Sequence, residues 1–505
     1  MTALRHPFTR RLKPRSESSR KYAQPALVAG MTVLSGLLVG RIAESHYGVT
    51  ALGVLIALPL LYTISRYPLA ALAAILIVVS TIVSYNNVPR VHLPGNPPIT
   101  VADVLLLSLV AGTWWRRRYS TWPRSVRHYT VAVIGFLLIS SVAAAGYSLT
   151  GVDQLRDSLA AFDAFLYLLV AATIAVELSS QNWRQTLDLL IVIAAVVSVV
   201  SIAAAVLPTV ASALSSATAN GVTAATSDAV SVGAPRVRFA GLFLVSGLVL
   251  PTLVLVLLYP DRYRWLRALA LLFMIGAVAV SLNRNMYVAL VLGFALTALL
   301  GGSRFRLGAI IAIVFLVGAL VVSGSLLPGV SSTLGSRASS LLDPATLSQT
   351  GSIQDRAYEY HYAFLSIAAH PWVGVGPKAF YGAYLLDNGI SSVRFFVQNF
   401  FVNTAVDYGI PATLAVLLIP LVVVFWGVRA LASGRRRHIS QSSQASQGPN
   451  QALLASLVAS VVVLLLSSLI GTYLQDAGTI AAFAVICGLL LGYSEHYAFD
   501  HQPHL

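Results

Sequence analysis

The chain has 505 residues, of which 57% are hydrophobic and only 10% are charged, and its mean hydropathy is +0.78. Soluble domains carry roughly 25% charged residues, so the composition excludes an ordinary soluble protein and predicts an all-α, polytopic membrane protein. The net charge of +15 comes from arginines that stand mostly in short loops between apolar runs. There they determine topology, so nucleic acid is not the predicted partner. The single cysteine, Cys487, excludes a disulfide framework and a thiolate metal site.

Long apolar runs divide the chain. A bilayer is crossed by about 20 apolar residues, so these runs predict about 12–14 transmembrane helices. Their approximate ranges are 23–41, 49–65, 67–85, 101–115, 129–149, 159–178, 185–207, 239–260, 268–283, 286–302, 307–326, 400–428, 451–472 and 478–494.

The distribution of basic residues predicts the orientation of the chain. Arginine and lysine crowd the N-terminal tail and every second loop, a pattern typical of cytoplasmic segments. Both termini are therefore expected in the cytoplasm. The predicted organisation is a basic cytoplasmic tail (1–22), transmembrane helices 1–11 (23–326), a long extracytoplasmic loop with short helices and the candidate site (327–400), C-terminal transmembrane helices (401–494) with a cytoplasmic linker (430–450), and a cytoplasmic tail (495–505).

A few arginines stand on the predicted outer side, against the positive-inside pattern. Arg284 lies in SLNRNMYVAL between two apolar runs, where an ionisable side chain is costly and suggests function. Arg356 opens an amphipathic helix, and Arg238 precedes a long span. Guanidinium groups bind phosphate oxygens in pairs, so a cluster at the membrane surface suits a lipid-linked diphosphate. The alternatives are headgroup anchoring for Arg238 and a surface pair of Arg356 with Glu359.

The polar segment 354–411 combines this amphipathic helix with a turn. One stripe along the predicted helix consists of Tyr358, Tyr362, Leu365 and Ala369. The polar side chains lie largely outside this stripe, namely Asp355, Arg356, Glu359 and Tyr360. The sequence PWVGVGP, residues 371–377, is predicted to be a stiff turn that brings helix 355–369 back towards 398–410. The alternative is a plain connector.

Three motifs in order carry a resemblance to a known family. The motifs resemble the arginine-bearing helices, the Pro-x-x-Gly-x-Gly turn and the His-Asn helix of the superfamily of O-antigen ligases and Wzy-type polymerases. In this chain they read SLNRNMY, QDRAYEYHYAFLSIAAHPWVGVGPKAF and VQNFFVNTAVDYGIPATL. The likeness covers residues 236–415. It implies a helical glycosyltransferase of the GT-C type in the inner membrane of a bacterium. Such an enzyme moves a glycan from a polyprenyl-diphosphate carrier onto the hydroxyl of a glycan or glycolipid acceptor at the outer face.

The resemblance implies roles for particular residues. Arg284 and Arg356 match the two diphosphate-binding arginines, and Arg238 is a looser match. Asn399 matches the asparagine of the His-Asn pair, but Gln398 stands where the family has its presumed base, and an amide cannot take a proton at neutral pH. Gln398 would then only orient the acceptor, or another group would serve as base. The candidates are Glu359, which is favoured, His361, His370, Asp355 and Asp387; Tyr360, Gly374 and Gly376 would shape the site around them.

The predicted enzyme uses no metal and no cofactor. No Asp-x-Asp pair lies on the predicted outer face, and no nucleotide-binding motif occurs, so guanidinium groups would stabilise the leaving diphosphate. The competing functions are a flippase for lipid-linked saccharides and a non-catalytic scaffold of the cell envelope. A flippase should carry cations at several depths within its helices, whereas here they gather near one face.

Overall fold

The computed structural model describes residues 68–79, 90–91, 99–116, 122–148, 162–178, 183–207, 210, 241–281, 283–301, 310, 314, 318, 351–377, 379, 382–385, 391–394, 397, 399–440, 447–470, 474 and 477–499. The predicted spans 23–41 and 49–65, nearly all of 307–326 and both predicted tails except residues 495–499 lie outside these residues, so their predictions are not tested.

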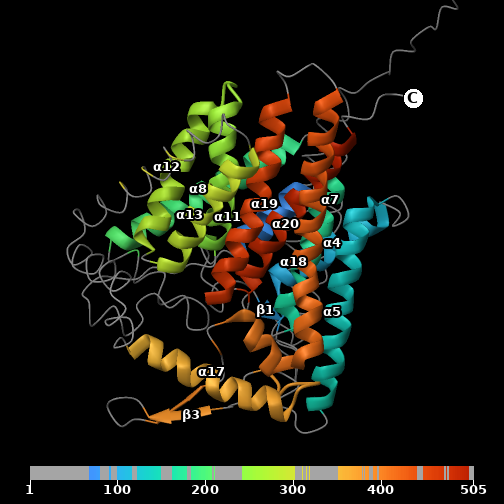
Figure 1. Cartoon of the computed structure of the whole chain (residues 1–505), viewed down its shortest axis with the longest axis vertical. Coiled ribbons are helices and arrows are strands. Elements are labelled where there is room, and N and C mark those ends of the chain that lie inside the picture. The colour runs from blue at the N-terminus through green and yellow to red at the C-terminus, as the bar shows by residue number, and fades with distance from the viewer. Residues whose placement is uncertain are drawn as a thin grey trace, which may run out of the picture. The chain divides into compact units, whose positions relative to one another are not determined.

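Helices make up nearly all of the described chain (Figure 1). They are α3 (Pro68–Val79), α4 (Val101–Arg116), α5 (Arg124–Ser148), α7 (Leu169–Leu178), α8 (Trp183–Val206), α11 (Gly241–Leu258), α12 (Arg264–Val280), α13 (Arg284–Gly301), α17 (Gly351–Ala369), α18 (Phe400–Ser440), α19 (Gln447–Ile470) and α20 (Ala477–Phe499). The described strands form two short antiparallel pairs. β1 (Arg90–Val91) pairs with β2 (Ile99–Thr100), and β3 (Gly382–Leu385) pairs with β4 (Ser391–Arg394).

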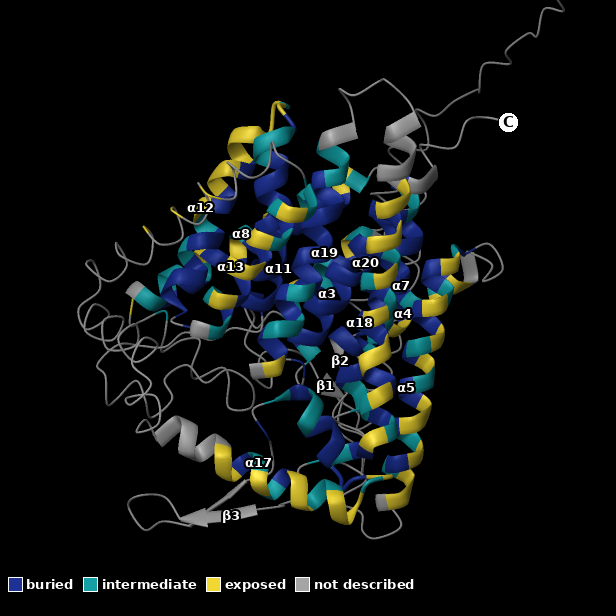
Figure 2. Ribbon diagram, in the orientation of Figure 1, coloured by how far each residue is buried: buried dark blue, intermediate teal, exposed yellow. Residues whose placement is uncertain are grey.

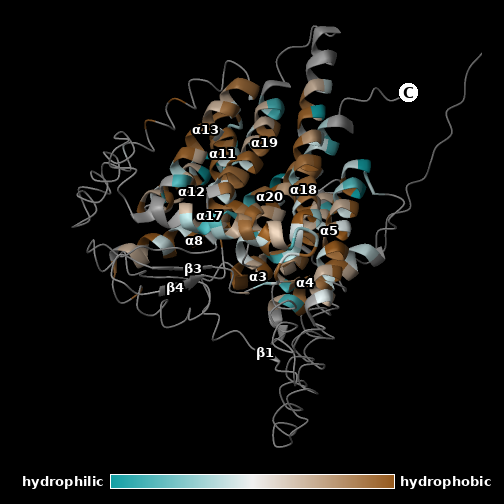
Figure 3. Cartoon of the chain, turned by 60° about the horizontal axis from the view of Figure 1, so that its bottom comes forward, coloured by the Kyte–Doolittle hydropathy of each residue, from teal (hydrophilic) through white to brown (hydrophobic). Residues whose placement is uncertain are grey.

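Six described helices are long and apolar enough to cross a membrane. They lie within α5, α8, α11, α18, α19 and α20, and shorter apolar helices lie within α3, α4 and α13. Figure 3 shows that hydrophobic residues dominate along these helices. Each pairs its backbone internally, which is what a hydrocarbon environment demands. The predicted all-α, polytopic membrane fold is therefore confirmed.

Three helices form the buried centre. Helices α11, α19 and α20 are buried along most of their length, whereas α5 and α18 keep exposed outer faces (Figure 2). Close contact needs small residues where helices meet. A Cβ atom added to Gly293 of α13 would lie 2.4 Å from Val463 of α19, and one added to Gly488 of α20 would lie 2.7 Å from the Ala171 carbonyl oxygen of α7.

The predicted span 159–178 is interrupted. A short helical stretch, 162–166, is separated from α7 by a turn at Tyr167 and Leu168. The Tyr129 hydroxyl on α5 donates a hydrogen bond of 2.8 Å to the Leu168 carbonyl, and the Tyr167 hydroxyl donates one of 2.9 Å to the Asp103 carboxylate on α4. These bonds satisfy polar groups at the break, where an unpaired carbonyl would be costly.

Helix α18 is broken at Gly409, whose φ of 83° and ψ of 174° are not helical. Phe401 before the break and Ile419 after it line the same pocket. Along a straight helix these residues would stand about 27 Å apart at 1.5 Å per residue, so the segment 400–408 folds back beside the helix that follows Gly409. The predicted span 400–428 falls within an apolar helical stretch long enough to cross a membrane, Phe400–Ser433, and is broken at Gly409. The helix after Gly409 exceeds the roughly 20 residues needed to cross a bilayer.

A buried arginine fastens the turn between α11 and α12. Arg267 is 4% exposed and binds two carboxylates. Its Nε and Nη2 atoms donate to Asp188 of α8 at 2.8 and 3.0 Å, and its Nη1 atom donates to both oxygens of Asp261 at 2.9 and 2.8 Å. Desolvation raises the pKa of Asp261, but the hydrogen bonds and charge of Arg267 outweigh it and hold that pKa below its usual value.

Further contacts gather several helix ends around this turn. The Tyr259 hydroxyl donates to Asn450 at the start of α19, and Gln451 donates to the Leu300 carbonyl at the end of α13. The end of α13 and the start of α19 therefore lie together with the α11–α12 turn. Helix α13 consequently begins, at Arg284, toward the opposite end of the bundle.

Trp426 of α18 packs on His128 of α5. Ser125 of α5 donates to Glu495 of α20, close to Tyr493, Trp183 and Tyr259 at the α11–α12 end. Gly409 precedes Trp426 by about 25 Å along the helix, so the break also lies toward the opposite end of the bundle.

Substituting Tyr129 with Phe should destabilise the fold, because the buried Leu168 carbonyl would lose its donor. The expected loss is about 1–3 kcal/mol, seen as a lower thermal unfolding temperature in detergent or nanodiscs. The matched control is Tyr263→Phe, since Tyr263 is 42% exposed. Equal unfolding temperatures for Tyr129→Phe and wild type would contradict this account of the break.

Substituting Asp188 with Asn should also destabilise the fold, since Arg267 would lose one of its charged partners. Asp188 is 34% exposed, so we expect a loss of about 1–2 kcal/mol after allowance for solvent screening.

Because the pKa of Asp261 is lowered, its pairing with Arg267 stabilises the fold at neutral pH, and this stabilisation is lost as the pH falls through that lowered value. Unfolding measured between neutral and acidic pH checks both effects. Asp261→Asn should flatten the acidic part of the profile, and an unchanged profile would contradict the pairing.

Candidate functional site

The amphipathic helix α17 is buried on the face that carries Glu359. Glu359 is 2% exposed and Ala363, one turn later, is fully buried. Ala363 shares an apolar cluster with Val397 and Val406. Side chains that pack around this cluster are Tyr360, Ile367, Val375 and Val402. The cluster attaches α17 to Val397, the residue before Gln398, and to the start of α18.

The turn after α17 docks against the break in α18 by main-chain contacts. The Val375 amide donates to the Val406 carbonyl at 2.7 Å, and the Gly376 amide donates to the Asp407 carbonyl at 3.1 Å. In return the Ile410 amide donates to the Pro371 carbonyl at 2.8 Å. The break at Gly409 frees these groups, because a continuous helix would use them internally. The predicted return of helix 355–369 towards 398–410 is confirmed.

Two glycines make this approach sterically possible. Gly374 has φ of 70°, and a Cβ atom there would lie 2.3 Å from the Val406 carbonyl oxygen. Gly409 has φ of 83°, and a Cβ atom there would lie 2.5 Å from the Trp372 carbonyl oxygen. A side chain at either position would face both the left-handed backbone penalty and a clash with main-chain atoms that cannot move aside.

Two asparagines hold the chain on both sides of Gln398. Asn399 caps α18, since its Oδ1 atom accepts the amides of Phe401 and Val402 at 3.0 and 3.1 Å. Asn403 accepts the Val397 amide through Oδ1 at 2.8 Å. Hydrogen bonds therefore hold the chain at Val397, before Gln398, and at Asn399, after it.

A carboxylate that the sequence reasoning missed completes this group. The Nδ2 atom of Asn403 donates to Asp407 Oδ2 at 2.6 Å. Asp407 therefore supports Asn403, which supports the chain before Gln398. The signal available in the sequence was the spacing of Asn403 and Asp407, which stand four residues apart on one helix, just before the Gly409 break.

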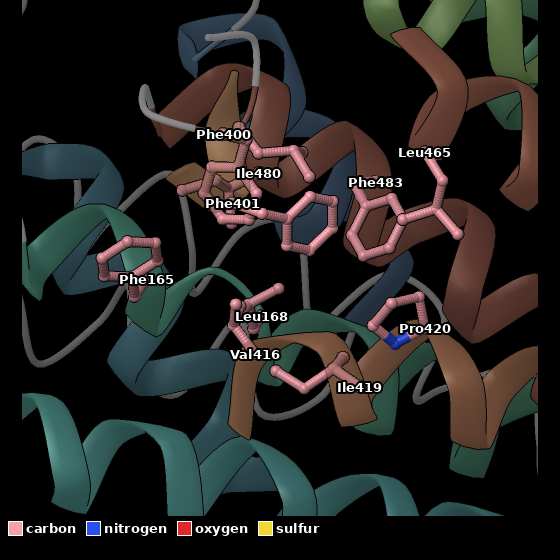
Figure 4. A pocket seen from close by; sticks show the side chains of 11 residues that line it. Phe165, Leu168, Phe400, Phe401, Val416, Ile419, Pro420, Leu465, Ile480 and Phe483 are labelled. Atoms are coloured by element: carbon pink, nitrogen blue, oxygen red, sulfur yellow. The ribbon is translucent and has the colours of Figure 1, made fainter. Parts of the chain in front are cut away.

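An apolar pocket opens beside the capped start of α18 (Figure 4). Its walls come from the helix 162–178 and from α18, α19, α20 and the stretch between the last two. The lining residues are Phe165, Leu168, Phe400, Phe401, Val416, Ile419, Pro420, Leu465, Leu474, Ile480 and Phe483. The walls offer no charged side chain, so this pocket suits a hydrocarbon segment and cannot itself perform acid–base chemistry.

Arg284 begins α13 at the turn that follows α12. The Asn283 carbonyl accepts the amides of Met286 and Tyr287, and the Tyr287 hydroxyl donates to the Ala279 carbonyl at 2.6 Å. These hydrogen bonds hold the turn before and after Arg284. Arg284 therefore stands at a helix end rather than in the middle of an apolar run.

The other predicted site residues fall into three groups. Tyr360 is half-buried and stacks on Phe364, with ring centroids 6.1 Å apart, whereas His361 and the alternative base His370 are exposed. Gly374, Gly376 and Asn399 shape the turn and the cap described above. The residues Gln398, Arg238 and Asp387, and the side chains of Arg284, Arg356 and Asp355, lie outside the described residues. Among the described residues, no group of three His, Cys, Asp or Glu could hold a metal ion.

Substituting Gly374 or Gly409 with Ala should separate the turn from α18. The left-handed backbone alone costs about 1–2 kcal/mol, and the main-chain clash adds to it. We expect faster hydrogen exchange at the amides of Val375 and Gly376, measured by mass spectrometry, together with lost function. The matched control is Gly146→Ala in α5, where an added Cβ meets nothing within 4 Å. Unchanged exchange in both variants would contradict the docking.

Comparison with known proteins gives one family and no individual relative. Residues 269–417 match the family model described as O-antigen ligase. No curated protein matches the chain. The matched residues run from α12 through the Arg284 turn, α17 and its glycine turn to the start of α18, which are the elements that build the candidate site. The resemblance drawn from the three motifs, all of which lie within residues 269–417, is confirmed by this match to the O-antigen ligase family model.

Proposed function

We propose that the chain is an integral-membrane glycosyltransferase that transfers or polymerises a glycan from a polyprenyl-diphosphate carrier onto an acceptor hydroxyl. The family match supports a role in the assembly of O-antigen or a related surface polysaccharide. The observation that carries the finer proposal is the docking of α17 on the start of α18. It joins the helix of Arg356 and Glu359 to the chain around Gln398 and Asn399.

In the proposed reaction the acceptor oxygen attacks the anomeric carbon of the donor sugar. A new glycosidic bond forms as the bond between that carbon and the diphosphate oxygen breaks, and the diphosphate leaves with the electron pair. Arg284 and Arg356, with Arg238 in support, would bind the phosphate oxygens and stabilise the charge that develops on them. Direct attack inverts the configuration of the sugar.

The acceptor hydroxyl must lose its proton, and Glu359 is the proposed base. Its carboxyl group lies on the buried face of α17, one turn before Ala363, which packs with Val397 next to Gln398. His361 is exposed, which makes it the weaker of the two candidates. Gln398 and Asn399 would orient the acceptor, with Tyr360 beside them. Asn403 and Asp407 act indirectly by holding this part of the chain.

The apolar pocket supports a lipid-linked donor. Its wholly hydrophobic walls adjoin Phe400 and Phe401, which follow Asn399 directly. The free volume is only about 20 Å³, room for about one water-sized group, so the walls would have to move apart before an isoprenoid segment could enter. We further propose that the site faces the extracytoplasmic side of a bacterial inner membrane. The α11–α12 end, where Arg262, Arg264 and Arg267 gather, would face the cytoplasm.

Replacing either arginine with alanine should remove most of the transfer activity. Purified protein in nanodiscs receives a polyprenyl-diphosphate oligosaccharide and an acceptor in the presence of EDTA, and product formation is followed by mass spectrometry. We expect wild type to form product without added metal. Arg284→Ala and Arg356→Ala should each lose about 10²–10³-fold in rate. Glu359→Gln should lose rate while donor binding persists, because an amide retains the shape but not the basicity.

The matched control is Arg262→Ala, since Arg262 is an exposed arginine in the α11–α12 turn. It should keep the wild-type rate. Product formation that survives both arginine substitutions would refute the site. Movement of the carrier lipid across the bilayer without any new glycosidic bond would favour a flippase.

A further inference from the structure

The apolar stripe of α17 faces away from the protein. Tyr358 is 52% exposed and Leu365 is 55% exposed, although both belong to the stripe that the sequence pattern assigns to an apolar environment. The turn that follows carries Trp372, 76% exposed, and Val373, 41% exposed. Side chains of this size gathered on one surface indicate contact with something other than water.

The stripe occupies one side of α17 and does not encircle it. At about 100° per residue, Tyr358, Tyr362, Leu365 and Ala369 share a sector of about 60°. His361 and Ala368 are also exposed, but they fall opposite the buried Glu359. Phe364 is exposed outside the stripe, where it stacks on Tyr360. The helix therefore has a buried face around Glu359 and Ala363 and one exposed arc, of which the apolar stripe forms one part.

Trp372 and Val373 continue a surface that already faces lipid. In the helix after Gly409, exposed apolar residues recur at helical spacing from Ile410 onward, namely Ile410, Leu414, Leu418, Leu421 and Phe425. This helix lies in a candidate membrane span, so its outer stripe contacts acyl chains. Ile410, the first residue of that stripe, donates its amide to the Pro371 carbonyl, directly before Trp372.

The position of α17 fits the surface of the bilayer. The helix crosses the end of the bundle instead of running along it, at the level where α5 ends and α18 turns (Figures 1 and 2). Tryptophan and tyrosine prefer the headgroup region, because their rings are apolar and their polar atoms seek water. A helix with one apolar side lies in the plane of that region.

We propose that the Tyr358–Leu365 side of α17 and the tip Trp372–Val373 lie in the headgroup region of the bilayer, so that α17 is an interfacial helix. The partner is the lipid surface of the membrane that the spanning helices cross. The proposal does not depend on the reaction. If the proposed reaction also holds, this placement carries Arg356 at the depth where a lipid-linked diphosphate lies.

Spin labels at single cysteines test the proposal on the full chain in nanodiscs. Cys487, the native cysteine, is fully buried, so unlabelled wild type serves as the blank. Leu365→Cys and Val373→Cys are compared with Arg262→Cys, a control in the α11–α12 turn, where Arg262 is exposed. Each label is exposed to oxygen, which concentrates in lipid, and to a water-soluble nickel chelate, while paramagnetic resonance reports the collisions.

We expect the ratio of oxygen to nickel collisions at Leu365→Cys and Val373→Cys to exceed that at Arg262→Cys by at least roughly twofold, as for a helix half-immersed in lipid. Equal ratios at all three positions would place the stripe in water and overturn the proposal. Protection of Leu365→Cys from both reagents would show that a second copy or another protein covers the stripe, and it would also overturn the proposal. Transfer activity is not part of this readout, so a failure here is distinct from a failure of the proposed reaction.

Discussion

The contact between the Gly374 turn and the Gly409 break is the constraint on which the candidate site depends. It is made by main-chain atoms: amides of the turn donate hydrogen bonds to carbonyls that would accept intrahelical hydrogen bonds in a straight helix. Such a contact has little freedom to slide, since moving one residue along would leave several buried polar groups without partners. The turn therefore sets the position of α17 relative to α18, and with it the position of Glu359 relative to the chain around Gln398.

The spanning helices could be predicted from the sequence because the bilayer leaves few alternatives. The apolar runs 185–207 and 239–260 correspond to α8 (Trp183–Val206) and α11 (Gly241–Leu258), with ends that differ by one or two residues. Hydrophobic length alone is informative in such cases, since a lipid-exposed backbone must be helical. The glycine turn was predictable for a different reason: Pro371, Gly374 and Gly376 exclude a continuing helix.

Other features could not be read from hydrophobicity. Residues 400–408 and those after Gly409 are both helical and continue one hydrophobic run, so hydrophobic length alone does not separate a straight span from a folded-back pair. The signals of the break are Asn403, Asp407 and the Gly409-Ile410-Pro411 sequence. The outward direction of the α17 stripe was hidden in the same way, because a periodic pattern shows that two faces differ but not which one meets protein. The spacing of Asn403 and Asp407 indicates their own contact, but the hydrogen bond from the Val397 amide to Asn403 depends on the fold, which no local spacing reveals.

Asn399 and Asn403, which both follow Gln398, have a consequence for substitutions at position 398. Their hydrogen bonds hold the backbone, through the Val397 amide on one side and the cap of α18 on the other. Neither bond involves the side chain at position 398. The backbone next to position 398 is therefore held by contacts that do not depend on which side chain stands there, so a substitution of Gln398 would leave these hydrogen bonds in place.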